Sequence, residues 1–111
     1  MKRISHEAFN RELERIREGL ARCGARKAIL FGSYARGDYH AGSDVDLVII
    51  KDTDRPFLER SAEVWRHCGS SVTIEPLVYT PAEFARMARE ENPFIEQVLR
   101  EGIAIYEDEP E

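Results

Sequence analysis

The sequence predicts a small α/β (α+β) domain in which helices flank a mixed sheet of three or four strands. Two observations carry this prediction. Short apolar runs at 27–31, 45–50 and 72–79 have the length and the β-branched character of strands. Around them, apolar residues recur at helical spacing between capping signals. All 111 residues are expected to form one domain, because domains commonly hold ~100–150 residues.

The N-terminal third is expected to hold one helix and one strand. Apolar residues recur at helical spacing over 5–22, with Ser5 as the N-cap and Gly24 just past the helix end. The apolar run at 27–31 predicts a buried strand, which Gly32 ends. Residues 32–43 hold three glycines among polar residues, so they predict a structured loop with room for one helical turn.

The middle third is expected to follow the order strand, helix, strand. Residues 45–50 are mostly apolar and β-branched, which is typical of a second buried strand. Helical periodicity at 55–67 puts Leu58, Ala62 and Trp65 on one face, and we expect that face to pack in the core. A third strand is expected at 72–79.

The C-terminal third carries clear helix signals. Thr80, Pro81 and Glu83 match a capping box with proline at the first helical position. Asn92 before a proline predicts a last helix at 93–101, and residues 103–106 predict a short edge strand. The apolar residues of these two helices are expected to cover the sheet or to form a partner surface: Phe84, Met87, Phe94, Val98 and Leu99.

Composition narrows the function classes. The chain is 42% hydrophobic and 33% charged, as in soluble globular proteins. Its net charge of −5 disfavours bulk binding of nucleic acid, which needs a basic surface. No apolar run reaches the ~20 residues of a membrane span, and no apolar leader opens the chain, so a cytoplasmic location is expected. Cys23 and Cys68 lack metal-ligand spacing and are expected to be reduced thiols.

Asp44 and Asp46 are the first candidates for chemistry. Side chains alternate across a strand, so residues i and i+2 present their carboxylates on one face. Two neighbouring acids repel each other, and a divalent cation between them removes the repulsion. Carboxylate oxygens are ligands that Mg²⁺ prefers. An Asp-x-Asp pattern alone also fits a solvated strand end. The sequence around it decides between a metal site and that alternative.

The turn at Gly32 and Ser33, where the first strand ends, supplies that context. A glycine here lets the backbone approach a phosphate closely, and the Ser33 hydroxyl and free N–H groups can donate to its oxygens. Arg36 adds a charge suited to phosphate, although a pair with Asp38 is an equally simple role. The Gly-x4-Gly spacing of a P-loop is present, but Asp38 and Tyr39 replace its Lys-Ser/Thr pair.

Together these residues resemble the minimal nucleotidyltransferases of the DNA polymerase beta superfamily. Gly32-Ser33, ten intervening residues and Asp44-Val45-Asp46 match the GS-x10-DxD signature. Residues 31–37 are similar to the family's FGSxARG and residues 42–47 to its GSDxDL, and the resemblance extends over about 27–84. It implies a palm-like nucleotidyltransferase fold over residues 1–111 and transfer of a nucleoside monophosphate to a hydroxyl group.

The resemblance also implies a metal site. Two Mg²⁺ ions, for which Mn²⁺ can substitute, are expected on three carboxylates, which are Asp44, Asp46 and an acid of the next strand. The acid in that strand is Glu75. Family members usually have an aspartate there, so Glu75 is expected as the third metal ligand and catalytic group, with an exposed strand-edge acid as the alternative.

The nucleotide-binding residues implied by the resemblance lie in the same loop. Gly32 and Ser33 are expected to position the phosphates of the triphosphate, with help from Arg36. Ser43 is expected either to contact a phosphate or to cap the entry into the second strand. The donor implied is ATP.

Members this short resemble the catalytic subunit that accompanies a helical HEPN-domain protein. In the toxin–antitoxin version, the nucleotidyltransferase adenylylates a tyrosine of its HEPN partner. The resemblance therefore implies an antitoxin role with a HEPN-domain partner, and a homo-oligomer is a further option.

Two alternative functions stay open. One is a catalytically silent nucleotide-binding or interaction module, for which the glutamate at position 75 argues weakly and against which the intact signature residues argue: Gly32, Ser33, Asp44 and Asp46. The other is a subunit of an aminoglycoside-type nucleotidyltransferase, which would need a further domain.

Overall fold

The computed structural model describes residues 6–39, 42–68 and 73–108. Ser5, the expected N-cap, and residue 72, the expected start of the third strand, lie outside these ranges. The elements follow the predicted order: α1 (His6–Cys23), β1 (Lys27–Phe31), α2 (Ser33–Arg36), β2 (Val45–Ile50), α3 (Phe57–His67), β3 (Ile74–Tyr79), α4 (Pro81–Arg89), α5 (Pro93–Glu101) and β4 (Ile103–Glu107). The predicted α/β class is confirmed.

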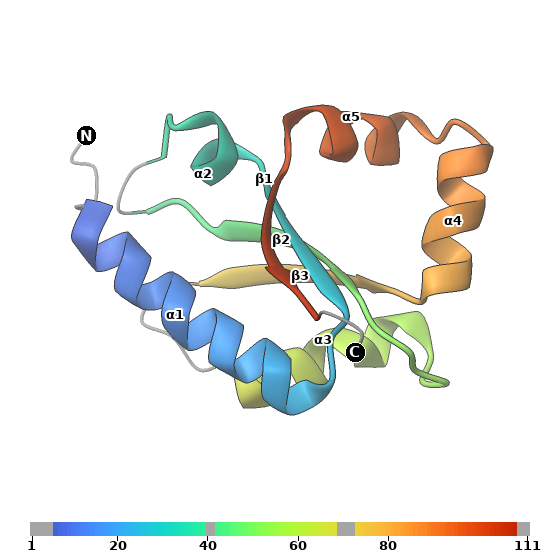
Figure 1. Cartoon of the computed structure of the whole chain (residues 1–111), viewed down its shortest axis with the longest axis horizontal. Helices are drawn as coiled ribbons and strands as arrows, with labels where there is room; N and C mark the ends of the chain where they lie inside the picture. The colour runs from blue at the N-terminus through green and yellow to red at the C-terminus, as the bar shows by residue number, and fades with distance from the viewer. Residues whose placement is uncertain (1–5, 40–41, 69–72, 109–111) are drawn as a thin grey trace.

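The strands form one four-stranded mixed sheet in the order β3-β2-β1-β4 (Figure 1). β1 pairs antiparallel with β2 and with β4, and β2 pairs parallel with β3. Parallel neighbours need a crossover connection, which α3 supplies. β4 therefore lies at an edge, as predicted, and β3 lies at the other.

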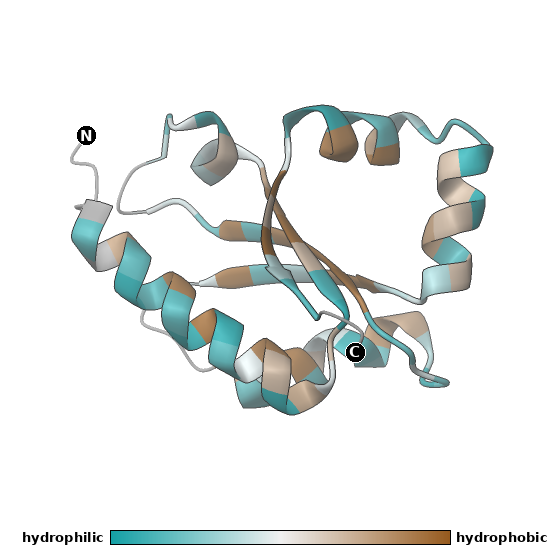
Figure 2. Cartoon of the chain, in the orientation of Figure 1, coloured by the Kyte–Doolittle hydropathy of each residue, from teal (hydrophilic) through white to brown (hydrophobic). Residues whose placement is uncertain are grey.

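Helices cover both faces of the sheet. α1 and α3 lie on one face, and α4 and α5 lie on the other (Figure 1). Apolar residues concentrate in the strands and on the inner sides of the helices, as Figure 2 shows. No helix within residues 6–39, 42–68 and 73–108 is both long and apolar enough to cross a membrane.

The smaller of the two apolar clusters lies under α5. Ile29 and Val48 of the sheet pack there against Val98, with Phe84 and Phe94 partly buried around them. The prediction that residues of α4 and α5 cover the sheet is confirmed for these three helix residues. Leu99 is 54% exposed and is not part of this cluster.

Local capping fixes where the last two helices begin. The Thr80 hydroxyl accepts a hydrogen bond from the Glu83 N–H at 3.1 Å, and the Glu83 carboxylate accepts one from the Thr80 N–H at 2.9 Å. The Asn92 side-chain oxygen accepts from the N–H groups of Phe94 and Ile95. Both predicted caps are confirmed, since each satisfies N–H groups that the first helical turn leaves unpaired.

The predicted buried face of α3 is wrong. Leu58 is 88% exposed and Trp65 is 53% exposed, and the buried residues of this helix are Arg60 and Val64. Arg60 is held inside by Glu83, whose carboxylate oxygens accept from its guanidinium at 2.7 and 3.3 Å. A charged residue can face the core here because a partner from α4 compensates its charge.

Trp65 instead protects the outer edge of β3. The Thr73 carbonyl accepts a hydrogen bond from the first residue of β2, so the carbonyl of the next residue, Ile74, points to the free edge. The Trp65 indole N–H donates to that Ile74 carbonyl at 3.1 Å, and Pro76 has no N–H to offer at this edge. The bonded Ile74 carbonyl and the absent N–H of Pro76 leave this edge fewer groups with which another strand could pair.

Candidate active site

The turn at Gly32 is shaped around an acidic side chain. Gly32 has φ 74° and ψ −152°, a conformation that other residues rarely adopt. A methyl group built on its Cα would collide with the Asp46 carboxylate oxygen Oδ2. Glycine therefore serves two needs here, since it permits the turn into α2 and leaves room for Asp46.

Strand register brings the predicted carboxylates to one end of the sheet. Asp46 of β2 pairs with Phe31 of β1 on one side and with Glu75 of β3 on the other. Side-chain alternation puts Asp46 and Glu75 on the sheet face that α4 and α5 cover further along, and Asp44 precedes Asp46 by two residues. Asp44 and Glu75 are exposed, whereas Asp46 is half-buried.

The three carboxylates influence one another. Burial is the main cause that raises the pKa of Asp46, and the negative charges of Asp44 and Glu75 raise it further. The positive charge of Arg36 opposes this shift. The end of the sheet thus carries an excess of negative charge that Arg36 offsets only in part and that a bound cation would neutralise.

These carboxylates fit Mg²⁺ as partial ligands and do not form a closed cage. Among the described residues, no three His, Cys, Asp or Glu side chains converge tightly enough to hold a metal by themselves. Mg²⁺ commonly binds one or two carboxylates and takes its remaining ligands from water and substrate phosphates. The donor set at this end of the sheet suits that open mode of binding.

Three stacked aromatic rings pack next to the turn and α2. Tyr34 of α2 stacks on Phe9 and on Tyr39 at ring-centroid distances of 4.5 and 4.4 Å, and Phe9 and Tyr39 contact each other at 5.5 Å. Burial raises the pKa of Tyr34, so its hydroxyl stays protonated. Sequence reasoning missed this support, although two tyrosines in an otherwise polar loop were a signal for it.

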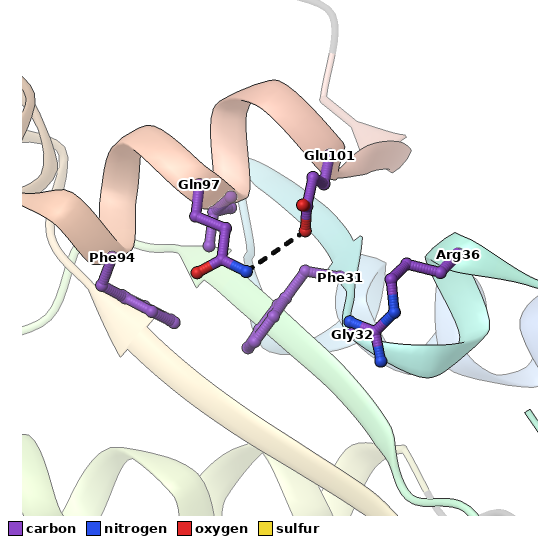
Figure 3. A pocket seen from close by; sticks show the side chains of 7 residues that line it. Phe31, Gly32, Arg36, Phe94, Gln97 and Glu101 are labelled. Atoms are coloured by element: carbon purple, nitrogen blue, oxygen red, sulfur yellow. Dashed lines mark hydrogen bonds between the residues drawn. The ribbon is translucent and has the colours of Figure 1, made fainter. Parts of the chain in front are cut away.

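A pocket of about 150 Å³ opens beside the turn (Figure 3). Gly32 and Arg36 form one end, and the side chains of α5 form the other. The α5 residues that line it were also missed as site residues, because the chain between them and Gly32 spans most of the domain: Phe94, Gln97, Val98 and Glu101. A larger hollow of about 410 Å³ lies between α1 and β4, and its lining includes no carboxylate.

The other predicted site residues lie around the same turn. Ser33 is the first residue of α2, and Ser43 is half-buried in the loop before Asp44. Arg36 is exposed, with its Nε 3.4 Å from the Asp38 carboxylate, so the pair named as its alternative role does form. At that length and exposure the pair is weak, and Arg36 can turn towards a phosphate.

A glycine turn that faces carboxylates at the end of a mixed sheet is an arrangement suited to phosphoryl and nucleotidyl transfer. Residues 14–111 match the family described as Polymerase beta, Nucleotidyltransferase. The chain belongs to this nucleotidyltransferase family, as the resemblance of its motifs predicted.

Two relatives come from Methanocaldococcus jannaschii, and each is named "Putative protein adenylyltransferase". The first is 62% identical over 29 residues, which are 26% of this chain and 29% of the relative. The second is 36% identical over 58 residues, which are 48% of this chain and 58% of the relative. The matched stretches thus span less than two thirds of either relative.

Solved structures share the fold. One described as a "putative minimal nucleotidyltransferase" has a TM-score of 0.61 at 27% identity, over 90% of this chain and 95% of its own. A Sulfolobus solfataricus nucleotidyltransferase structure gives 0.58 at 21% identity, over 88% and 82%. A toxin–antitoxin structure with AMP-PNP gives 0.57 at 17% identity, over 87% and 74%. The last two likenesses concern the fold alone.

Proposed function

We propose that this nucleotidyltransferase moves AMP from ATP, with Mg²⁺, to a tyrosine hydroxyl of a HEPN-domain partner and so acts as an antitoxin. The observation that carries the proposal is the close approach of the Gly32 turn to the Asp46 carboxylate, which supports a metal held by Asp46 beside a phosphate held by the turn. The names of the two M. jannaschii relatives support the acceptor as a protein. The toxin–antitoxin neighbour, which shares the fold and was solved with AMP-PNP, agrees with a nucleoside triphosphate donor and a toxin as partner, and its description does not name a HEPN domain.

The donor triphosphate would bind at the start of α2. The N–H groups of Ser33 and Tyr34 precede the first hydrogen bonds of the helix, which run to the Gly32 carbonyl, so these two would donate to phosphate oxygens. The Ser33 hydroxyl adds a donor, and Arg36 adds a positive charge. Ser43, the residue directly before Asp44, is the last residue proposed to contact the phosphates.

Asp44, Asp46 and Glu75 would hold two Mg²⁺ ions, for which Mn²⁺ can substitute. When bound, these ions neutralise the charge of the triphosphate and lower the pKa of the acceptor hydroxyl. Asp46 is the central ligand, because it lies between the turn and Glu75 in the register of the sheet. Glu75 is exposed on the open side, where an acceptor can approach.

In the transfer step, the acceptor oxygen forms a bond to the α-phosphorus of ATP. The bond from that phosphorus to the bridging oxygen of the β-phosphate breaks, and pyrophosphate leaves with the electron pair. The hydroxyl proton passes to the Glu75 carboxylate and then to water. The protein supplies position and charge rather than a covalent intermediate.

Transfer from α-labelled ATP tests this proposal. The chain is incubated with Mg²⁺ and a HEPN-domain protein encoded beside it, in wild-type form and with single Tyr→Phe changes. Label is expected on the wild-type partner and is expected to disappear with one tyrosine change, with EDTA, and with Asp46→Asn. Asp54→Asn is the matched control, since Asp54 is an exposed acid in the loop after β2.

Three outcomes separate the parts of the proposal. Label on the partner that survives Asp46→Asn contradicts the metal site. Label that survives every tyrosine change contradicts the acceptor. An ATP-binding chain that labels no partner contradicts the adenylylation and supports a silent nucleotide-binding module.

A further inference from the structure

The pocket between α5 and the Gly32 turn carries an inference about which base the donor contains. We propose that this pocket receives the base of the donor nucleotide and that the side chains of α5 select adenine. The inference rests on the proposed function, because it assumes that the triphosphate lies at the start of α2. Its selecting residues lie on α5, which the signature motifs do not include.

The size and position of the pocket fit one part of a nucleotide. Its volume of about 150 Å³ is below the ~300–1,000 Å³ of pockets that enclose a whole ligand. It therefore suits the base of a nucleotide rather than the whole nucleotide. It opens directly against Gly32 and lies on the same sheet face as Asp46. A nucleotide whose phosphates lie at the turn can therefore reach it with its base.

Charge sets the direction in which a nucleotide would lie. Arg36 stands at the end of the pocket beside Gly32, whereas Glu101 stands on α5 (Figure 3). The Arg36 guanidinium attracts phosphate, and the Glu101 carboxylate repels it. The phosphates belong at the turn, and the uncharged base belongs beside α5.

Two aromatic rings give the base a surface to stack on. Phe31 and Phe94 meet edge to face, with centroids 5.4 Å apart at 81°. Both are partly buried, and both line the pocket. Rings held in this way present fixed faces, and stacking on such faces favours the larger double ring of a purine.

Gln97 supplies the selection among purines. Its Nε2 amide group donates to the Glu101 carboxylate at 3.3 Å, and its amide oxygen lies on the side of Phe94 (Figure 3). Gln97 and Glu101 thus offer acceptors. An exocyclic amino group, as on C6 of adenine, can donate to them, whereas a carbonyl at the same position would face another acceptor and lose its partner.

Calorimetry with three ligands tests the inference on the full chain in the presence of Mg²⁺. The ligands are ATP, inosine triphosphate, which has a carbonyl in place of the 6-amino group, and inorganic tripolyphosphate, which has no base. Wild-type protein is expected to bind ATP at least about tenfold more tightly than inosine triphosphate. Gln97→Leu is expected to bring that ratio to within about twofold and to leave tripolyphosphate binding unchanged.

Two further variants complete the design. Phe94→Leu keeps an apolar side chain and is expected to weaken ATP and inosine triphosphate alike, about fivefold or more, with tripolyphosphate unaffected. Glu96→Gln is the matched control, because Glu96 is exposed on the same helix and does not line the pocket. It is expected to match the wild type with all three ligands.

The outcomes distinguish the base site from the function on which it rests. Equal binding of ATP and inosine triphosphate by the wild type, or an unchanged ratio in Gln97→Leu, overturns the base site while tripolyphosphate binding keeps the donor site standing. A wild type that binds neither ATP nor tripolyphosphate in Mg²⁺ overturns both.

Discussion

Replacing Gly32 by alanine tests the contact on which the site depends. The backbone at Gly32 has φ 74° and ψ −152°, a region that costs other residues about 1–3 kcal/mol. The new methyl group also collides with Asp46 Oδ2, and relieving such an overlap adds about 1 kcal/mol or more. Gly32→Ala should therefore destabilise the protein by about 2–4 kcal/mol and displace the Asp46 carboxylate.

Gly37→Ala is the matched control for this change. Gly37 has a similarly positive φ of 88°, but a methyl group there meets nothing within 4 Å. It should cost only about 1–2 kcal/mol of left-handed backbone strain. At about 4 °C per kcal/mol for a domain of this size, the Tm should fall by roughly 8–16 °C for Gly32→Ala and by roughly 4–8 °C for Gly37→Ala.

Thermal unfolding measures the two Tm values, and calorimetry with ATP and Mg²⁺ measures the consequence for the site. Gly32→Ala should weaken binding at least about tenfold because Asp46 moves, whereas Gly37→Ala should bind like the wild type. Equal losses of Tm together with equal ATP affinity in the two variants would refute the reasoning that Gly32 makes room for Asp46.

Three further predictions concern stability. Because the pKa of Asp46 is raised from its ordinary 3.8, its contribution to stability is present below that pH and is lost as the pH rises through the folded value. Asp46→Asn should remove this slope in chemical denaturation, and parallel pH profiles would contradict it. The hydrogen bond from Arg60 lowers the pKa of Glu83 from 4.5, so its contribution is present above 4.5 and is lost as the pH falls through the folded value. Glu83→Gln should destabilise by about 1 kcal/mol at neutral pH and by less in acid, and a loss independent of pH would count against the pair. Trp65→Phe should cost about 1 kcal/mol in urea unfolding, while Leu58→Ser on the same exposed face should stay within about 0.5 kcal/mol, and equal effects would deny the edge-capping role.

The parts of the fold that the sequence predicts well depend on neighbours along the chain. The capping residues Thr80, Glu83 and Asn92 act within three residues of themselves, so their pattern is visible without the fold. The strands at 27–31 and 45–50 are likewise visible, because burial on both faces leaves continuous apolar runs.

The orientation of α3 could not be predicted in this way. Helical periodicity offers two faces, one with Leu58 and Trp65 and the other with Arg60 and Val64. Apolar content alone favours the first face. The second is buried because Arg60 meets Glu83 of α4, a partner more than twenty residues away that periodicity does not take into account.

Some residues of the candidate site could likewise be predicted from a local pattern, and others depend on the fold. Gly32 and Asp46 are visible because they belong to one signature, and the contact between them agrees with its spacing. The pairing of Asp46 with Glu75 depends on the register of β2 and β3, which the sequence does not fix. The position of Gln97 at the pocket requires α5 to fold back over β1, so no local pattern could reveal it.

Asp44 and Asp46 are proposed to bind the metal that holds the donor nucleotide beside Gly32. Calorimetric titration of ATP with and without Mg²⁺ into the wild type, Asp44→Asn/Asp46→Asn and the control Asp54→Asn tests it most directly. The wild type and Asp54→Asn should bind ATP in a Mg²⁺-dependent manner, and the double variant should lose that dependence together with at least about tenfold in affinity. ATP binding that is equally tight and equally Mg²⁺-dependent in the double variant would contradict the account.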